Sequence, residues 1–270
     1  MTLSGRTIAV PETRELDVFA AMLERRGAKV LRCPLVAILD APDPQPVLDW
    51  VRRFNAGECD DLILLTGEGL RRILSCIERH ASELRAPFVA ALARVRKITR
   101  GPKPARALRE LGLKPDLAAE HPTTEGVIRA LEGEPLGGRR VTVQRYGNKP
   151  NVPLESFLQS AGAQVSIVEP YVYADAAADA AVLELLQKMA AGEVDLIAFT
   201  SAVQVDRLFS VGTPELVKAA FERTAVAAVG PVVASTLEER GIAVRLMPEE
   251  SYFMKPLTTA IERELGSRGE

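Results

Sequence analysis

The chain has 270 residues, of which 47% are hydrophobic and 26% charged, and its formal net charge is −2. This is the composition of an ordinary globular protein, and the near-neutral charge excludes the strong basic excess that nucleic-acid binders usually carry. The length suits two domains better than one.

Short apolar runs alternate with helical patterns along the whole chain. In chain order, the sequence predicts strands at 7–10, 29–34, 61–66, 95–99, 140–144, 164–173, 195–200, 225–229 and 243–248. The helices expected between them are 15–27, 45–56, 68–80, 102–112, 123–132, 153–162, 176–192, 202–210, 214–222, 231–241 and 255–265. Strands separated by helix-length segments indicate βαβ units, so the predicted fold class is α/β with parallel sheets.

Three pairs of segments show that the sequence repeats itself. "RGPKPARALRELGL" (100–113) shares its framework with "VGPVVASTLEERGI" (229–242), at an offset of 129 residues. "DLILLT" (61–66) resembles "DLIAFT" (195–200), which matches Asp61 with Asp195 and Thr66 with Thr200. "MLERRGAKV" (22–30) resembles "FLQSAGAQV" (157–165). A period this long with two copies predicts an internal duplication into two α/β halves.

Two proline-containing segments are poor helix formers and occupy matching places in the two copies. They are "CPLVAILDAPDPQP" (33–46) and "VEPYVYAD" (168–175). Proline disfavours helix both at its own position and at the residue before it. If the two segments run side by side, they form a two-stranded hinge through which the chain passes twice.

Candidate binding residues follow the predicted strands, because ligands of parallel sheets bind beyond the carboxyl ends of the strands. The first amides of a helix have no internal partner and carry the positive end of its dipole, and glycine allows close approach to the backbone. The four turns in question predict a cleft for a substrate with several carboxylates. Equally, their hydroxyls can cap helices and their glycines can permit turns. The turns are Thr66-Gly67, Arg100-Gly101-Pro102, Thr200-Ser201 and Gly230-Pro231.

The charged candidates near these turns are Arg14, Arg100, Lys103, Arg145 and Lys149. Arginine and lysine in loops are usually solvated surface residues. Arg14 and Arg145 rank above the other candidates because each follows a predicted strand.

The chain shows no nucleophile-base motif, P-loop or dinucleotide fingerprint. Chemistry without a metal or cofactor must depend on positioning and on a proton donor, for which Tyr171 and Tyr173 in the hinge segment are candidates.

Cysteine and histidine usage predicts neither a metal site nor a disulfide framework. Cys33, Cys59 and Cys76 lack CxxC spacing, and His80 and His121 are isolated. The N-terminal residues do not resemble a signal peptide, and no apolar run approaches the ~18 residues of a membrane span. We therefore expect a cytoplasmic protein with no membrane and no nucleic-acid partner.

Over most of its length the sequence resembles the uroporphyrinogen-III synthase family. The stretches that carry the resemblance are "DLILLTGEGLRRIL", "TRGPKPARALRELGL", "YGNKPNVPLESFLQSAGAQVSIVEPYVY", "DLIAFTSAVQVDRLF" and "VAAVGPVVASTLEERGI". The resemblance implies two α/β domains joined by a two-stranded ladder. Domain one would comprise 1–36 and 174–270, domain two 41–167, and the hinge strands about 35–40 and 168–173.

The resemblance also implies a reaction. The family is a lyase that cyclises the linear tetrapyrrole hydroxymethylbilane in haem biosynthesis, inverting the last pyrrole ring, without cofactor or metal. Its proposed proton donor maps to Tyr171, with Tyr173 as the alternative. Where some relatives have threonines after the second Gly-Pro, this chain has Val232 and Val233. The implied substrate-binding residues are Arg14, Thr66, Gly67, Arg100, Gly101, Lys149, Thr200, Ser201 and Gly230.

Two other functions compete with this one. A domain of the same fold could bind a tetrapyrrole or another polyacid as a sensor without catalysis. A two-domain binding protein of periplasmic type would need an export signal, which the N-terminal sequence does not show. For the synthase we expect a small-molecule substrate as the partner and a monomeric protein.

Overall fold

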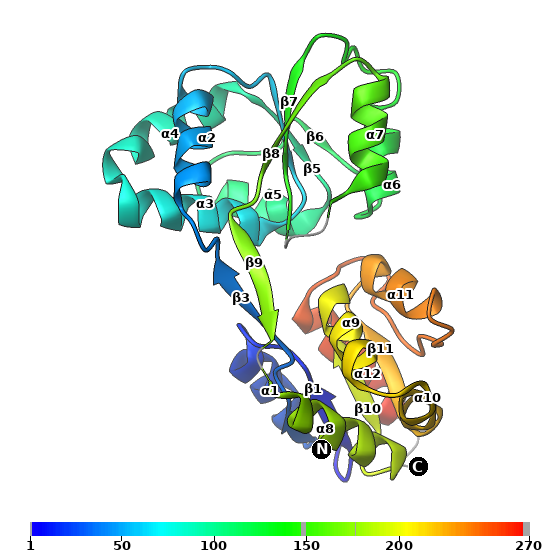
Figure 1. Ribbon diagram of the computed structural model, residues 1–270. Helices are drawn as coiled ribbons and strands as arrows, with labels where there is room; N and C mark the ends of the chain where they lie inside the picture. The colour runs from blue at the N-terminus through cyan, green and yellow to red at the C-terminus, as the bar shows by residue number, and fades with distance from the viewer. Residues whose placement is uncertain (1, 147–149, 176, 267–270) are drawn as a thin grey trace. The chain divides into compact units, whose positions relative to one another are not determined.

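The computed structural model describes residues 2–146, 150–175 and 177–266 (Figure 1). The chain divides into two compact units. Unit 1 comprises Met1–Ala37 and Ala174–Glu270, and unit 2 comprises Ile38–Tyr173. Each unit holds a parallel sheet with helices between its strands, so the predicted α/β class is confirmed.

Unit 1 contains a four-stranded parallel sheet in the order β11-β10-β1-β2. Its strands are β1 (Thr7–Val10), β2 (Lys29–Arg32), β10 (Leu196–Phe199) and β11 (Ala225–Ala228). Its helices are α1 (Leu16–Glu24), α8 (Asp179–Ala190), α9 (Ala202–Val211), α10 (Pro214–Arg223), α11 (Pro231–Glu238) and α12 (Met254–Gly266).

Unit 2 contains a five-stranded parallel sheet in the order β6-β5-β4-β7-β8. Its strands are β4 (Asp61–Leu64), β5 (Arg96–Thr99), β6 (Leu117–Ala118), β7 (Arg140–Gln144) and β8 (Gln164–Val168). Its helices are α2 (Gln45–Asn55), α3 (Gly67–His80), α4 (Arg85–Arg94), α5 (Pro102–Arg109), α6 (Thr124–Leu131) and α7 (Val152–Ser160), with a 3-10 turn at Ser82–Leu84.

The core of unit 2 lies on both faces of its sheet. Leu62 and Leu64 of β4 pack into one hydrophobic cluster with α2, α3 and α4, whereas Ile63 and Leu65 pack into a second cluster with α6 and α7. Successive residues of a strand point to opposite faces, so a strand covered on both sides is apolar at most positions. This is why β4 is apolar from Leu62 to Leu64, after the buried Asp61 with which it begins.

The two extended segments pair as expected. β3 (Val36–Asp40) and β9 (Tyr171–Asp175) form a separate two-stranded sheet. The second strand starts later than the predicted 168–173, because residues up to Val168 belong to β8 and Glu169 and Pro170 separate the two. The single strand expected at 164–173 is therefore two strands.

Three other elements differ from expectation. Helix α4 was not predicted; Pro87 resembles a helix breaker but lies in the first turn, where proline costs no hydrogen bond. The two-residue strand β6 is too short to give a periodic signal. The strand expected at 243–248 is reduced to one bridge between Ala227 and Leu246.

The two units share one strand order, which supports the predicted duplication. Unit 1 reads β11-β10-β1-β2 and unit 2 reads β5-β4-β7-β8, with β6 added beside β5. Thus β4 corresponds to β10, β5 to β11, β7 to β1 and β8 to β2. Unit 1 takes its β1-β2 pair from the start of the chain, whereas the corresponding pair of unit 2 comes last.

Hydrogen bonds fix which residues correspond. Asp195 accepts from the amide of Thr7 at 2.8 Å, and Asp60 accepts from the amide of Arg140 at 2.9 Å. Asp195 therefore corresponds to Asp60, so its predicted match with Asp61 was wrong by one residue. The error arises because Leu62–Leu64 of β4 and the whole of β10 are apolar, and such a run shows no alternation of apolar and polar residues by which to fix its register.

The one-residue shift also changes which hydroxyl residues of the two copies correspond. Thr66 is the N-cap of α3, and its counterpart in unit 1 is Ser201, the N-cap of α9. Thr200, which the sequence matched with Thr66, corresponds to Leu65. Thr66 and Thr200 are therefore not equivalent members of the two copies.

Candidate functional site

Five residues of unit 2 come together at the carboxyl edge of its sheet. Thr66 follows β4, Arg100 follows β5, Gln144 and Tyr146 end and follow β7, and Tyr171 begins β9. We call these five the carboxyl-edge cluster. Three of them were predicted from the sequence, and all lie where parallel sheets place their ligands.

A chain of hydrogen bonds runs through three members of the cluster. The side-chain amide nitrogen of Gln144 donates to the carbonyl of Arg145, which leaves its oxygen Oε1 facing Thr66. That oxygen lies 3.2 Å from the Thr66 amide and 3.4 Å from Thr66 Oγ1. The Tyr171 hydroxyl lies 3.1 Å from Thr66 Oγ1. Either the Tyr171 hydroxyl or the Thr66 hydroxyl can be the donor of this bond.

Tyr171 is held in its protonated form. The residue is 1% exposed, and its ring packs edge-on against the ring of Tyr173, with 5.6 Å between the ring centres. Burial raises the pKa of Tyr171 well above its ordinary value, and Tyr173 raises it further. The hydrogen bond with Thr66 and the charge of Arg100 act on this pKa in the opposite direction. At neutral pH the phenol therefore remains a proton donor.

Arg100 carries a positive charge that no carboxylate neutralises within the described residues. Its Nη1 donates to the Tyr146 hydroxyl at 3.2 Å, and its guanidinium lies 4.8 Å from the centre of the Tyr146 ring. The stacked ring fixes the plane of the guanidinium and leaves its other N–H groups for a ligand. A half-buried, oriented guanidinium of this kind is suited to a carboxylate.

The glycines beside these residues are required for packing. A Cβ atom on Gly67 would lie 2.6 Å from the carbonyl oxygen of Lys103, so the starts of α3 and α5 come close only because Gly67 has no side chain. A Cβ on Gly101 would lie 2.6 Å from Cβ of Pro122. The sequence predicted that a ligand would approach the backbone at these two glycines. In the structure, Lys103 and Pro122 occupy the space beside them.

The other basic candidates of unit 2 have different outcomes. Arg145 forms ion pairs with Glu155 at 2.6 Å and Glu169 at 3.3 Å. Burial lowers the pKa of Arg145, but these partners outweigh it and raise the pKa overall. Lys103 is exposed on α5. Lys149 lies outside the described residues.

In unit 1, Thr200 and Ser201 are engaged within the chain. Oε1 of Gln204 accepts from the amides of Thr200 at 2.9 Å and Ser201 at 3.2 Å. The Thr200 hydroxyl donates to the carboxylate of Glu12. The capping alternative considered from the sequence therefore applies to Ser201, which begins α9.

The remaining candidates of unit 1 lie at the same carboxyl edge. Gly230 is the N-cap of α11, and a Cβ there would lie 3.0 Å from Tyr252. Val233 is buried, whereas Val232 is half-buried. Arg14 is exposed after β1, and its amide donates to Glu12 at 3.2 Å.

Sequence reasoning missed Gln144, Tyr146 and Glu12. All three end or follow a predicted strand, which is the same signal that selected Arg145 and Arg14. Their roles depend on hydrogen bonds to residues far away in the chain, so position alone did not distinguish them.

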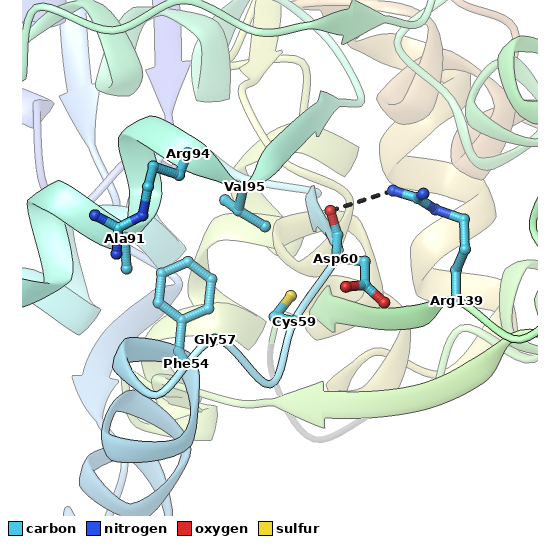
Figure 2. Close-up of a pocket in the computed structure, with 8 residues that line it drawn as sticks. All are labelled: Phe54, Gly57, Cys59, Asp60, Ala91, Arg94, Val95 and Arg139. Atoms are coloured by element: carbon cyan, nitrogen blue, oxygen red, sulfur yellow. Dashed lines mark hydrogen bonds between the residues drawn. The ribbon is translucent and has the colours of Figure 1, made fainter.

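A pocket of about 250 Å³ lies at the opposite, amino edge of the unit 2 sheet. Figure 2 shows Arg139 beside Asp60, whose carbonyl accepts its hydrogen bond at 3.4 Å. Arg139 also pairs with the buried Asp61, and Asp60 with Arg140. Because these charges neutralise one another, we interpret the pocket as part of the structural contacts at the start of β4, and not as a ligand site. Its lining residues are Phe54, Gly57, Cys59, Asp60, Ala91, Arg94, Val95 and Arg139.

Two features are absent from the described part of the chain. Its His, Cys, Asp and Glu side chains form no group of three or more that could hold a metal ion. None of its helices has both the length and the apolar character that a membrane crossing requires.

Comparison with known proteins shows which family this chain resembles. The family model described as "Uroporphyrinogen-III synthase HemD" matches residues 17–258. The uncharacterized protein YjjA of Bacillus subtilis is 33% identical over 92% of both chains. A putative uroporphyrinogen-III synthase of Methanothermobacter thermautotrophicus is 28% identical over 91% of this chain and 92% of its own.

Solved structures agree with the sequence comparison. A mutant uroporphyrinogen III synthase of Thermus thermophilus superposes with a TM-score of 0.77 at 29% identity, covering 98% of this chain and 100% of that one. The uroporphyrinogen-III synthetase of Helicobacter pylori, 15% identical over 97% and 100% of the two chains, shares the fold with a TM-score of 0.53. With the family model matched over most of its length, the chain belongs to the uroporphyrinogen-III synthase family.

Proposed function

We propose that the protein is an active uroporphyrinogen-III synthase, a lyase that cyclises hydroxymethylbilane and inverts its last pyrrole ring. The observation that carries the proposal is the guanidinium of Arg100, which no carboxylate of the described residues neutralises. Tyr146 orients it at the carboxyl edge where Thr66 and Tyr171 also meet. Membership of the family supplies the reaction.

The substrate suits this edge because it carries carboxylates on acetate and propionate arms. Arg100 would bind one of them through two parallel N–H donors. The bilane closes unaided to the uninverted isomer, so the protein must direct which carbon is attacked. To direct the attack, the protein must hold the substrate by contacts of fixed geometry, and the Tyr146 ring fixes the orientation of Arg100 for such a contact.

Tyr171 would supply the proton for the leaving group. As the carbon–oxygen bond of the hydroxymethyl group breaks, the oxygen takes the phenol proton and leaves as water, and the pyrrole nitrogen stabilises the electron-poor carbon. The raised pKa of Tyr171 keeps the proton in place beforehand. Donation requires the Tyr171 hydroxyl to turn from Thr66 towards the ligand, because the two are bonded in this structure.

The experiment is an isomer assay. Hydroxymethylbilane is generated in situ by its synthase, the purified protein is added, and the products are oxidised to porphyrins and separated. We expect the type III isomer to predominate. Only type I isomer, equal to the reaction without added protein, would reject the proposal.

A sensor of the same fold is the second candidate, and the burial of Tyr171 favours it. A phenol that is 1% exposed can serve as a structural residue behind a binding surface. A sensor would bind uroporphyrin in a fluorescence titration yet leave the isomer ratio unchanged. A synthase would change the ratio.

A further inference from the structure

The side chain of Arg72 joins helix α3 to strand β3. Arg72 lies on α3, and its Nη1 donates to the carboxylate of Asp40 at 2.8 Å. Its Nη2 donates to the carbonyl of Ile38 at 3.1 Å, and its Nε donates at 2.7 Å to Glu68, one turn earlier on the same helix. Arg79 also pairs with Asp40, at 2.7 Å. Each of the three nitrogens of the Arg72 guanidinium thus has an acceptor, and two of these acceptors lie on β3.

Strand β3 in turn holds the start of β9. The two strands form a separate sheet and run in opposite directions (Figure 1). The amide of Ala41, which follows β3, donates to the carbonyl of Pro170 at 3.3 Å, so the end of β3 lies beside the start of β9. Tyr171 comes directly after Pro170, and its hydroxyl lies 3.1 Å from Oγ1 of Thr66, the N-cap of α3. The contacts therefore close a loop that starts and ends on α3, within unit 2.

The second copy of the duplication repeats this ion pair at corresponding positions. Arg207 follows the N-cap of α9 at the same distance as Arg72 follows the N-cap of α3. Asp175 is the last residue of β9, as Asp40 is of β3. Within unit 1, 3.1 Å separates Nε of Arg207 from Oδ1 of Asp175, and Arg207 also pairs with Asp179 of α8 at 2.6 Å. Each copy therefore fixes the end of a connecting strand, but the carboxyl-edge cluster belongs to unit 2 alone.

Building on the proposed function, we propose that Arg72 is a positioning residue for Tyr171. By fixing β3 on α3, Arg72 also fixes β9, and with it the phenol that would supply the proton, beside Thr66. A phenol whose position varies is less often aligned with the leaving oxygen, so the contribution of Arg72 is geometric. The guanidinium exchanges no proton with the substrate. Lysine cannot replace it, because a single ammonium group does not present the planar fork that reaches all three acceptors.

The alternative is that Arg72 only stabilises the fold, while the packing around the buried Tyr171 fixes its position. Arg72→Lys separates the two roles. Arg207→Lys is the matched control, because it makes the same change in the corresponding ion pair of unit 1. Asp40→Asn weakens the contact from its other side. Each variant is compared by steady-state kinetics with in situ hydroxymethylbilane, by thermal melts and by hydrogen exchange of backbone amides.

For Arg72→Lys we expect kcat to fall by roughly tenfold while KM changes by less than about threefold, because a misplaced donor impairs proton transfer more than binding. Asp40→Asn should reproduce this loss. Arg207→Lys should keep the kcat of the wild type, although both lysine variants lose stability. The amides of 171–173 should exchange faster in Arg72→Lys than in Arg207→Lys. Added to Tyr171→Phe, Arg72→Lys should lower kcat no further, because it acts through that phenol.

Three outcomes would overturn the proposal while leaving the synthase function intact. Equal kcat values for Arg72→Lys and Arg207→Lys would show that the effect is not specific to the strand that carries Tyr171. Losses of kcat that multiply when Arg72→Lys is combined with Tyr171→Phe would show that Arg72 acts independently of the phenol. Unchanged exchange at 171–173 in Arg72→Lys would show that β9 does not depend on Arg72. A wild-type protein that forms no type III isomer rejects the synthase function itself, and the exchange comparison then still tests whether Arg72 holds β9.

Discussion

The phenol oxygen of Tyr171 lies 3.1 Å from Oγ1 of Thr66. This contact joins the first residue of β9 to the N-cap of α3, two positions that are more than a hundred residues apart in the chain and lie in the same unit. It brings the proton donor implied by the family resemblance and a predicted binding hydroxyl into one hydrogen-bond chain with Gln144.

Tyr171→Phe removes one hydroxyl and almost no volume. We expect kcat for type III isomer to fall by roughly a hundredfold, as is typical when a proton donor is lost. The free energy of unfolding should fall by only about 1 kcal/mol, because one hydrogen bond is lost. Tyr173→Phe is the control, since Tyr173 is the alternative donor. Loss of activity in Tyr173→Phe alone would transfer the role to Tyr173.

The raised pKa of Tyr171 also predicts how stability depends on alkaline pH. The pKa is higher in the folded protein than in the unfolded chain, so the stabilisation is complete below the unfolded value of about 10 and declines as pH rises above it. Denaturant melts of the wild type should therefore show a steeper alkaline loss than those of Tyr171→Phe. Parallel profiles would contradict the assignment.

Thr66→Val separates capping from function. Thr66 accepts from the Gly69 amide at 3.0 Å, and Thr123 accepts from the Gly126 amide at 3.0 Å at the start of α6. Thr123→Val is therefore the matched control. Each of the two valine variants should lose about 1 kcal/mol of unfolding free energy, because an N-cap is removed. Only Thr66→Val should also reduce type III formation. Equal effects on activity would mean that the hydroxyl of Thr66 acts through stability alone.

Arg100→Lys keeps the charge but removes the planar group stacked on Tyr146. We expect KM to rise by roughly tenfold, which corresponds to the loss of one bidentate carboxylate contact. Tyr146→Phe keeps the stacked ring and should have a smaller effect. Arg109→Lys, the same exchange at an exposed position of α5, is the matched control. If Arg109→Lys raised KM as much, a contact specific to Arg100 would not explain the result.

Asp60→Asn tests the ion pair between Asp60 and Arg140 at the amino edge of the unit 2 sheet. The hydrogen bonds from Arg140 lower the pKa of Asp60 to about 2. Because the folded value lies below the unfolded value of about 4, the stabilisation is present above pH 4 and is lost as pH falls to about 2. Wild type and Asp60→Asn should therefore differ most near neutral pH and converge in acid. A constant difference across the titration would contradict the ion-pair assignment.

Much of the fold follows from local sequence. The alternation of apolar runs with helical patterns predicts parallel α/β units, because only that arrangement buries strands such as β4 on both faces. The prolines of 33–46 exclude helix from most of that segment, and β3 and β9 pair as expected. Thr66 and Ser201 were recognisable as helix starts because an N-cap depends only on the next few residues.

Tertiary structure decided the rest. Apolar strands carry no register signal, so only the bonds of Asp60 and Asp195 to neighbouring strands corrected the match between the copies. The sequence likewise selected Arg100 and Arg145 by the same rule, but folding pairs Arg145 with two glutamates and leaves Arg100 unneutralised within the described part of the chain. Whether a charge remains available depends on which distant residues fold beside it. Spacing along the chain does not contain that information.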